Sequence, residues 1–413
     1  MDRLSRVLAA KRDFLVPCVY HFYQRPPVLV RGEGAYLFDV DGRRYVDCFS
    51  GVTVMNAGHS NPDIIEPAIA QLRQLQHTTS VYLTEPVLEL ARAMAELAPV
   101  GLRRSFFCAS GSEANEGAML LAARVTGRKE FIYLGESLHG RTKAAMSVTD
   151  LAMWRSDPNL PCNAIRVPGP CHAESLAAVA ALLRRETIAA VIAEPIQGNG
   201  GIVVPPDHYW FELRLLCSRY KTLLIADEIQ TAWNRTGRWF AVDHWGIVPD
   251  VITVAKALGN GFPIAAYLTS DAHAELCTRP AGCTFGGNLV SCRAALATLM
   301  FHQEHNLGER STRLGDSLMK RLRELAKRHP NIAEVRGRGL MVGVELREGE
   351  GHPAAAMTDA VLEDMKDRGY LIGKCGHARN VLALMPPLVI EEKSLDGLVD
   401  ELDSVFASVA RKG

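Results

Sequence analysis

The stretch VPDVITVAKALGNGFPIAAYL, Val248 to Leu268, places one lysine, Lys256, where an apolar run meets a glycine-rich turn. The apolar run indicates a strand, so the lysine follows a strand end directly. An ammonium group that is buried without a partner is strongly destabilised unless its pKa falls. Lys256 is therefore either a surface residue whose long side chain reaches water or a group that takes part in chemistry.

Short apolar runs alternate with helical segments from about Pro86 to Val290, and this alternation decides the fold class. Strands that alternate with helices predict a mostly parallel sheet wrapped in helices. The candidate strands are RSFFCAS, EFIYLGES, AAVIAEPIQ, TLLIADEIQ and VITVAK. The lysine of the opening stretch therefore follows one strand of an α/β sheet.

The two ends of the chain predict a smaller α+β domain. AYLFDVDGRRYVDCF is typical of a hairpin around the turn Asp41-Gly42, and the runs LMVGVEL and NVLALMPPLVI near the C-terminus are typical of strands. A chain of 413 residues also exceeds what one hydrophobic core usually organises. We expect an N-terminal segment of the small domain (residues 1–50), a large α/β domain (51–303) and a C-terminal small domain (304–413).

The composition disfavours several classes of protein. With 46 basic and 46 acidic side chains, the chain has no net charge with which to attract nucleic acid or an anionic membrane. No apolar run approaches ~18 residues and the N-terminus lacks a signal-peptide core, so we expect a soluble, cytoplasmic protein. The ten cysteines form no CxxC pair, and His302 and His305 are expected on an exposed helix surface, so we expect no disulfide framework and no metal.

Three successive candidate strands end in charged residues. Glu194 follows AAVIA, and Lys256 follows VITVA. Between them in the sequence, TLLIA ends in Asp227 and Glu228. A single acid at such a place is usually a cap or a surface charge. However, ligands of open parallel sheets bind beyond the carboxyl ends of the strands, so three charged strand ends in succession favour a chemical site.

The segment CASGSEANEGAMLLAARVTGR brings a turn of small residues, Ser110-Gly111-Ser112, to the start of a helical segment. Backbone N–H groups and the positive end of the helix dipole at such a turn can bind a phosphate. The other interpretation is an ordinary helix N-cap formed by Ser112, with Glu113 in the first turn. No GxxxxGK[ST] motif is present, and RGRGLMVG near Gly337 lacks the context of a dinucleotide-binding motif.

A phosphate cradle, an acid and a buried lysine together fit pyridoxal phosphate. Its aldehyde needs an amine for a Schiff base, and its ring nitrogen needs an anionic partner. The motifs SGSEAN, LHGRT, EPIQGNGG, LIADEIQTAWNRTG and CTFGGN occur in this order, with Lys256 twenty-nine residues after Asp227. This pattern, which extends over nearly the whole chain, resembles the class-III (ω-) aminotransferases of the fold-type-I pyridoxal-phosphate superfamily, nearest the alanine–glyoxylate type-2 and ω-amino-acid–pyruvate branch.

The resemblance implies a fold, an assembly and three roles. The fold would be a large αβα domain around a mostly parallel seven-stranded sheet, and the assembly a homodimer, sometimes paired into a tetramer, with shared active sites. Lys256 would form the Schiff base and later move a proton. Asp227 would pair with the pyridinium nitrogen, and Gln230 would hydrogen-bond the phenolic oxygen of the cofactor.

Further cofactor contacts follow from the same resemblance. Gly111 and Ser112 would hold the phosphate, and Thr284 of CTFGGN would reach it from the other subunit. Glu194 would be a second acid near the cofactor, and His139 of LHGRT also matches a cofactor-binding position. No residue is expected to bind a metal.

Three positions depart from the family pattern. Leu138 replaces the aromatic residue that stacks on the cofactor ring in relatives, which lowers the expected ring affinity by about 0.5–1.5 kcal/mol. Ala383 replaces the arginine that binds the α-carboxylate of glutamate, and Asn199 replaces the glutamate that neutralises this arginine when another substrate enters. A glutamate without its arginine would be an unpaired charge, so the two losses go together and disfavour glutamate as the donor.

Other residues are candidates for contact with substrate. Arg141 of HGRT matches the arginine that holds a distal carboxylate in relatives acting on ω-amino acids, although it can also tie the loop down. Arg379 in GHARNVLA lies near Ala383 in the sequence and is a second candidate for carboxylate binding. Tyr20 and Tyr23 of VYHFYQ resemble the N-terminal segment that covers the substrate pocket, although aromatic stripes also occur in cores.

We therefore expect a pyridoxal-phosphate-dependent transaminase with a ping-pong mechanism. It would move an amino group from an amine or an ω- or β-amino donor to a small 2-oxo acid. Another reaction on the same fold, such as that of a phospho-lyase, aminomutase, racemase or decarboxylase, is the alternative, because fold does not determine function. A non-catalytic scaffolding protein is disfavoured by the presence of Lys256, Asp227 and Gln230.

Overall fold

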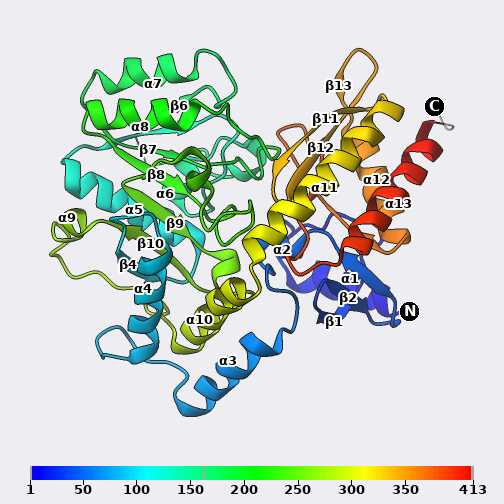
Figure 1. Ribbon diagram of the computed structural model, residues 1–413, viewed down its shortest axis with the longest axis horizontal. Coiled ribbons are helices and arrows are strands. Elements are labelled where there is room, and N and C mark those ends of the chain that lie inside the picture. Colours follow the sequence, from blue (N-terminus) through cyan, green and yellow to red (C-terminus); the bar gives the residue numbers. More distant parts are fainter. Residues whose placement is uncertain (1, 161–162, 411–413) are drawn as a thin grey trace.

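A seven-stranded sheet lies at the centre of the larger part of the molecule (Figure 1). The structure is a computed structural model that describes residues 2–160 and 163–410. The strands are β4 (Arg104–Cys108), β5 (Glu130–Leu134), β6 (Ala164–Val167), β7 (Ile188–Ala193), β8 (Leu223–Asp227), β9 (Val251–Val254) and β10 (Ala265–Thr269). Their order across the sheet is β4, β10, β9, β8, β7, β5, β6.

The mostly parallel sheet predicted from the sequence is confirmed. Neighbouring strands from β9 to β6 run parallel, whereas β10 is antiparallel to both β9 and β4. All the strands that the sequence predicted are present. The structure adds two strands to this sheet, β6 and β10, that were not predicted. β6 is a short edge strand that contains a charged residue, Arg166, and β10 follows β9 through a turn too short for the helix that a parallel return requires.

Helices cover both faces of this sheet, because successive strand residues point to opposite sides. Ile225 of β8 packs with α5 (Gly111–Thr126) on one face. Its neighbour Leu224 packs with α7 (Ser175–Leu183) and α8 (Tyr209–Arg219) on the other. Every residue of β7, β8 and β9 is buried, so polar side chains are found at the strand ends.

Two smaller sheets bring the ends of the chain together (Figure 1). The strands are β1 (Leu29–Glu33), β2 (Tyr36–Asp39), β3 (Arg44–Asp47), β11 (Ile332–Arg338), β12 (Met341–Glu348), β13 (His352–Pro353), β14 (Tyr370–Leu371), β15 (Gly373–Cys375) and β16 (Val381–Leu384). β2 and β3 form the predicted hairpin around Asp41-Gly42, and β14 extends it in parallel to β3. The N-terminal strands thus pair with the C-terminal part of the chain, while the domain limits near residues 50 and 303 stay a prediction.

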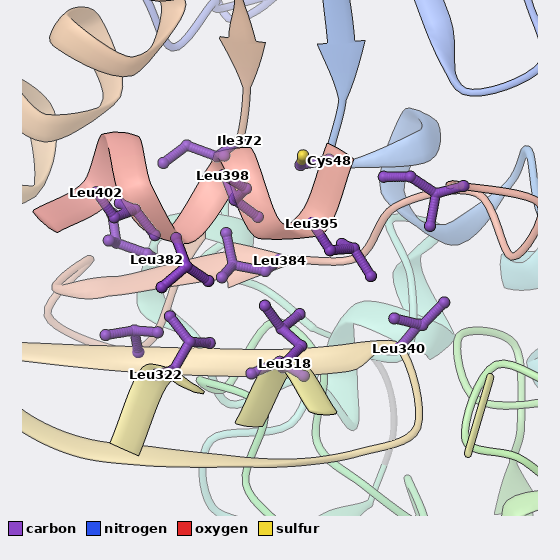
Figure 2. Close-up of a cluster of buried hydrophobic side chains, with 14 of the residues drawn as sticks. Cys48, Leu318, Leu322, Leu340, Ile372, Leu382, Leu384, Leu395, Leu398 and Leu402 are labelled. Carbon is purple, nitrogen blue, oxygen red and sulfur yellow. The ribbon is translucent and has the colours of Figure 1, made fainter. Parts of the chain in front are cut away.

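The part of the molecule that contains the two smaller sheets has its own hydrophobic core, which lies between three helices and β16. The helices are α11 (Leu307–Arg328), α12 (Ala355–Asp367) and α13 (Glu392–Ala410). Figure 2 shows the leucines of β16 lying between those of α11 and those of α13. The labelled leucines of these three elements are Leu318 and Leu322 of α11, Leu382 and Leu384 of β16, and Leu395, Leu398 and Leu402 of α13. This core holds the hairpin β15–β16 in place.

The remaining helices are α1 (Arg3–Phe14), α2 (Ser50–Thr53), α3 (Pro62–Gln74), α4 (Glu85–Leu97), α6 (Lys143–Ser147), α9 (Asp271–Ala274), α10 (Leu289–Glu304) and the 3-10 helices η1 (Ala152–Trp154), η2 (Ala241–Trp245) and η3 (Lys256–Leu258). Across residues 2–160 and 163–410, no helix combines the length and apolarity needed to cross a membrane.

The expected exposure of His302 on α10 is wrong. His302 is buried, its ring stacks near Trp239, and its Nδ1 lies 3.3 Å from Nδ2 of Asn234. Burial lowers the pKa of its imidazole to about 3. His305 is exposed, as expected. No group of three or more histidine, cysteine or acidic side chains in the described part of the chain is arranged to hold a metal.

Candidate active site

The ends of three neighbouring strands open onto one cavity of about 380 Å³, here called the inner cavity. Glu194, Asp227 and Lys256 lie at the carboxyl ends of β7, β8 and β9 and line this cavity. The N-terminus of α5 completes part of the wall. Other lining residues are Gly111, Ser112, Leu138, His139, Asn199 and Gln230. Every predicted cofactor-binding position except Thr284 therefore lines a single cavity.

Lys256 follows β9 after a single residue, Ala255. Its backbone has a φ of +47°, a left-handed conformation that a non-glycine residue keeps only when its surroundings impose it. Burial lowers the pKa of its amine to about 8, although the carboxylates of Asp227 and Glu194 oppose the shift. More of this amine is unprotonated at neutral pH than in a solvent-exposed lysine, and the unprotonated amine is the nucleophile.

Two side chains hold one oxygen of the Asp227 carboxylate, and this residue is 3% exposed. Its Oδ2 lies 2.7 Å from Nδ1 of His139 and accepts a hydrogen bond of 2.8 Å from Nδ2 of Asn115. Asn115 is fixed in turn by the hydroxyl of Thr253, which donates to its Oδ1 at 2.7 Å. Asn115 ends the motif SGSEAN, but its contact with Asp227, 112 residues away in the sequence, emerges only from the fold.

The other two acids at the strand ends have different surroundings. Glu194 accepts hydrogen bonds from the backbone N–H groups of Leu138 at 3.0 Å and Gly198 at 2.9 Å, and so joins two loops that close the inner cavity. Burial raises the pKa of its carboxyl to about 7. Glu228 does not line the cavity; it accepts from two backbone N–H groups of η2, and burial raises its pKa to about 7 as well. Glu228 therefore has a structural role.

Gln230 lies three residues after Asp227, with its amide at the wall of the inner cavity. Its Oε1 is buried and has no hydrogen-bond partner among the described residues. The amide oxygen and nitrogen exchange places by rotation, so either can face a bound molecule. A Cβ atom at position 198 would lie 1.4 Å from Oε1 of Gln230, so any residue larger than glycine there requires this amide to move.

The N-terminus of α5 faces the same cavity. Ser110 is the N-cap, and its Oγ accepts a hydrogen bond of 3.3 Å from the N–H of Glu113. The N-cap is therefore Ser110, whereas the alternative interpretation expected Ser112, and Ser110, Gly111 and Ser112 all line the cavity. N–H groups in the first turn of a helix lack acceptors within the helix and attract anions. The Oγ of Ser112 also accepts a hydrogen bond of 3.0 Å from the N–H of Arg141.

A second cavity of about 370 Å³, here called the outer cavity, adjoins the inner one. The two cavities share Leu138, Gly140, Asn199 and Lys256 in their walls. Both Arg141 and Arg379 line the outer cavity. Much of the remaining wall is apolar or aromatic and consists of Tyr20, Phe22, Phe49, Leu151, Met153 and Trp154. A molecule that reacts at Lys256 would extend into this space.

Three predicted positions lie outside both cavities. Tyr23 packs against the hydrophobic core, and its hydroxyl donates to the carbonyl of Ile372 at 2.9 Å, so the expectation that it covers the substrate pocket is corrected. Tyr20 and Phe22 of the same aromatic run line the outer cavity, whereas Tyr23 does not. Ala383 is buried among apolar side chains on β16, and Thr284 is exposed on the loop before α10.

Comparison with known proteins identifies the family of this chain. The family model for aminotransferase class-III matches residues 21–406. The mitochondrial alanine–glyoxylate aminotransferase 2 homolog 2 of Arabidopsis thaliana is 36% identical over 411 residues, which cover 96% of this chain and 86% of that protein. The acetylornithine aminotransferase of Mycobacterium tuberculosis H37Rv is 40% identical over 410 residues, which cover 98% of each chain.

A solved structure shows the same fold with a different reaction. A phospholyase from Arthrobacter, in complex with phosphoethanolamine, has a TM-score of 0.91 and 31% sequence identity, over 97% of this chain and 99% of that chain. The family match and the relatives nevertheless extend over nearly the full sequence. This chain belongs to the class-III aminotransferases, which depend on pyridoxal phosphate.

Proposed function

We propose that this aminotransferase takes an amino group from an amine, or from an ω- or β-amino acid, and transfers it to a small 2-oxo acid in two half-reactions. One observation carries the assignment of the chemical centre. The amine of Lys256, whose pKa is lowered, lines the same cavity as the buried carboxylate of Asp227.

The side chains of the inner cavity fit pyridoxal phosphate by their chemistry. Asp227 offers an anion to the ring nitrogen, and the N-terminus of α5 offers N–H groups to the phosphate. The unpartnered amide of Gln230 suits the ring oxygen. When bound, the cofactor supplies an electron sink for the carbon that bears the substrate amine.

Lys256 would hold the cofactor between turnovers and move the proton during them. Once a substrate amine has displaced it, its Nζ can take the proton from the carbon that bears the amine and later return it. A pKa of about 8 suits this work, because a base is most effective when its pKa lies near the working pH. Asp227, fixed by His139 and Asn115, would keep the ring nitrogen protonated.

The proposed class of amino donor rests on the side chains of the outer cavity and on the residue at position 383. Ala383 is packed in an apolar cluster, and Asn199 is uncharged, so neither position supports a donor bound as glutamate is in relatives. Arg141 lines the outer cavity and supports a distal carboxylate on ω-amino acids. The aromatic wall around Tyr20 supports donors with an apolar or aromatic body.

Steady-state assays test this proposal. Amines, β-amino acids, ω-amino acids and amino sugars would each be paired with pyruvate and with 2-oxoglutarate. We expect turnover with amine or ω-amino donors and pyruvate. Fast turnover with glutamate alone would refute the proposed donor class.

A second candidate function is favoured by the phospholyase structure. That protein binds phosphoethanolamine, and the cations of the outer cavity also suit a phosphate monoester. Release of phosphate from an amino-alcohol phosphate, without any requirement for a 2-oxo acid, would favour this reaction over transamination.

The proposed assembly is a cytoplasmic homodimer whose subunits complete each other's sites. Thr284 is exposed and away from both cavities of its own chain, which supports a contact with the phosphate bound by a second copy. Sedimentation of the Thr284→Arg variant, together with its affinity for the cofactor, tests this arrangement. A wild-type monomer with full activity would refute it.

A further inference from the structure

The outer cavity has a one-sided charge. Four cationic side chains line it, namely Arg141, Lys256, Lys374 and Arg379, whereas no acidic side chain of the described residues does. Lys374 has an acidic partner, Asp359, outside the wall. Arg141 and Arg379 pair with no carboxylate in residues 2–160 and 163–410. A cavity of this kind attracts an anionic group.

The backbone holds Arg379 in a fixed place. It lies in the turn between β15 and β16, where it adopts a φ of +57°. Its N–H donates to the carbonyl of Gly376 at 3.0 Å, and the N–H of Gly376 donates to the carbonyl of Asn199 at 2.9 Å. Because Asn199 lines both cavities, the turn that carries Arg379 is tied to the wall near Lys256.

Aromatic rings also orient the guanidinium group. Its central carbon lies 5.7 Å from the ring centre of Tyr20 and 6.0 Å from that of Phe22. One amino group lies 3.2 Å from the sulfur of Met153, a weak acceptor that leaves the charge uncompensated. A guanidinium held over aromatic rings keeps its edge available, and that edge matches a planar carboxylate.

The hairpin β15–β16 carries both Arg379 and Ala383, the position at which relatives bind the substrate carboxylate. Ala383 lies on β16, buried among Met341, Val381 and Met385, so an acid group cannot be received there. Any 2-oxo acid nevertheless brings a carboxylate next to its reacting carbonyl. We propose that Arg379 binds this carboxylate, so that the adjacent carbonyl carbon faces the inner cavity at Lys256. The inference rests on the proposed function and adds the residue that selects oxo acids over carboxylate-free carbonyl compounds.

The test isolates the acceptor half-reaction. Apoenzyme loaded with pyridoxamine phosphate is mixed with pyruvate, or with propanal, which lacks the carboxylate, and the change in cofactor absorbance is followed in a single turnover. Arg379→Asn removes the cation but tolerates the left-handed backbone. Arg379→Lys keeps the charge without the paired donors. His377→Asn, on the same exposed turn but outside the outer cavity, is the matched control.

We expect Arg379→Asn to raise the half-saturating concentration of pyruvate by about 10- to 100-fold, with little change for propanal. Arg379→Lys should recover part of the loss, and His377→Asn should match the wild type. Unchanged saturation by pyruvate in Arg379→Asn would overturn the inference, as would an equal loss with propanal. If the loaded wild type converts no oxo acid at all, the proposed function fails and this inference fails with it.

Discussion

Nδ1 of His139 and Oδ2 of Asp227 lie 2.7 Å apart, and both side chains are shielded from solvent. Asn115 donates to the same oxygen at 2.8 Å. Hydrogen bonds of this kind fix the orientation of a carboxylate, and they are strong where water is excluded. The cofactor ring would therefore meet an anion that is already oriented.

Replacing His139 by alanine should weaken cofactor binding. A lost hydrogen bond to a charged group contributes about 1.5–3 kcal/mol, so the dissociation constant of pyridoxal phosphate should rise about 10- to 100-fold. This dissociation constant is measured by titrating the apoenzyme with pyridoxal phosphate while the absorbance of the cofactor is monitored. His305→Ala, at an exposed histidine, should bind as the wild type does, and equal affinity in both variants would contradict this role.

Lys256→Ala should abolish the covalent retention of the cofactor. After reduction with borohydride and denaturation, mass spectrometry should find the cofactor attached to the wild type and to Lys129→Ala, an exposed lysine, but not to Lys256→Ala. Transamination should fall by roughly 10²- to 10⁴-fold, the usual contribution of a positioned acid–base group. Attachment at another lysine in the wild type would refute the assignment.

The rate at which apoenzyme captures pyridoxal phosphate should depend on pH through Lys256. Because the unprotonated amine reacts and its pKa is about 8, the rate should rise with pH and level off above this value. Glu194 raises this pKa, so Glu194→Gln should move the midpoint to lower pH. Stopped-flow absorbance gives the profile. A midpoint near that of free lysine would contradict the burial of the amine.

Gly198→Ala should disrupt the inner cavity without affecting its charges. The added methyl group would lie 1.4 Å from Oε1 of Gln230, so the amide must leave its place. We expect weaker cofactor binding and a lower melting temperature.

The double variant Gly198→Ala/Gln230→Ala is the control, because it removes the clash. It should recover thermal stability but not the cofactor affinity of the wild type. If the two substitutions were additive in stability, the clash would be refuted.

Glu228→Gln should change how stability depends on pH. The pKa of Glu228 is about 7 in the folded protein, against 4.5 for a glutamate in water, so the folded form binds the extra proton between these values. Stability conferred by the protonated carboxyl is complete below about pH 4.5 and is lost as pH rises through about 7. The stability of the wild type relative to Glu228→Gln should therefore fall by up to about 3 kcal/mol over this range, as measured by urea unfolding. A constant difference would contradict the shift.

The chemistry at the strand ends was accessible from the sequence because the rule behind it is local. Apolar runs locate strands, parallel strands share an edge, and Glu194, Asp227 and Lys256 therefore had to approach one another. The helix that starts at Gly111 follows from the same kind of local pattern.

The direction in which a given side chain points could not be predicted from these local sequence patterns. Tyr23 turns into the core and Tyr20 toward the cavity, although both belong to one aromatic run. His302 is buried because Trp239 and Asn234 cover it, and both come from distant parts of the sequence. Tertiary packing determines the direction and the burial of these side chains, and the spacing of residues along the chain does not reveal that packing.

Strand β14 completes a sheet that the N-terminus begins, with Val46 beside Tyr370. On the ribosome, the first strands emerge long before this partner is made, so the nascent chain must wait for nearly its whole length before the sheet can close. Until then an open strand edge invites pairing with other chains. Late synthesis of the closing strand makes the speed of translation, and the supply of chaperones, part of how this enzyme reaches its folded form.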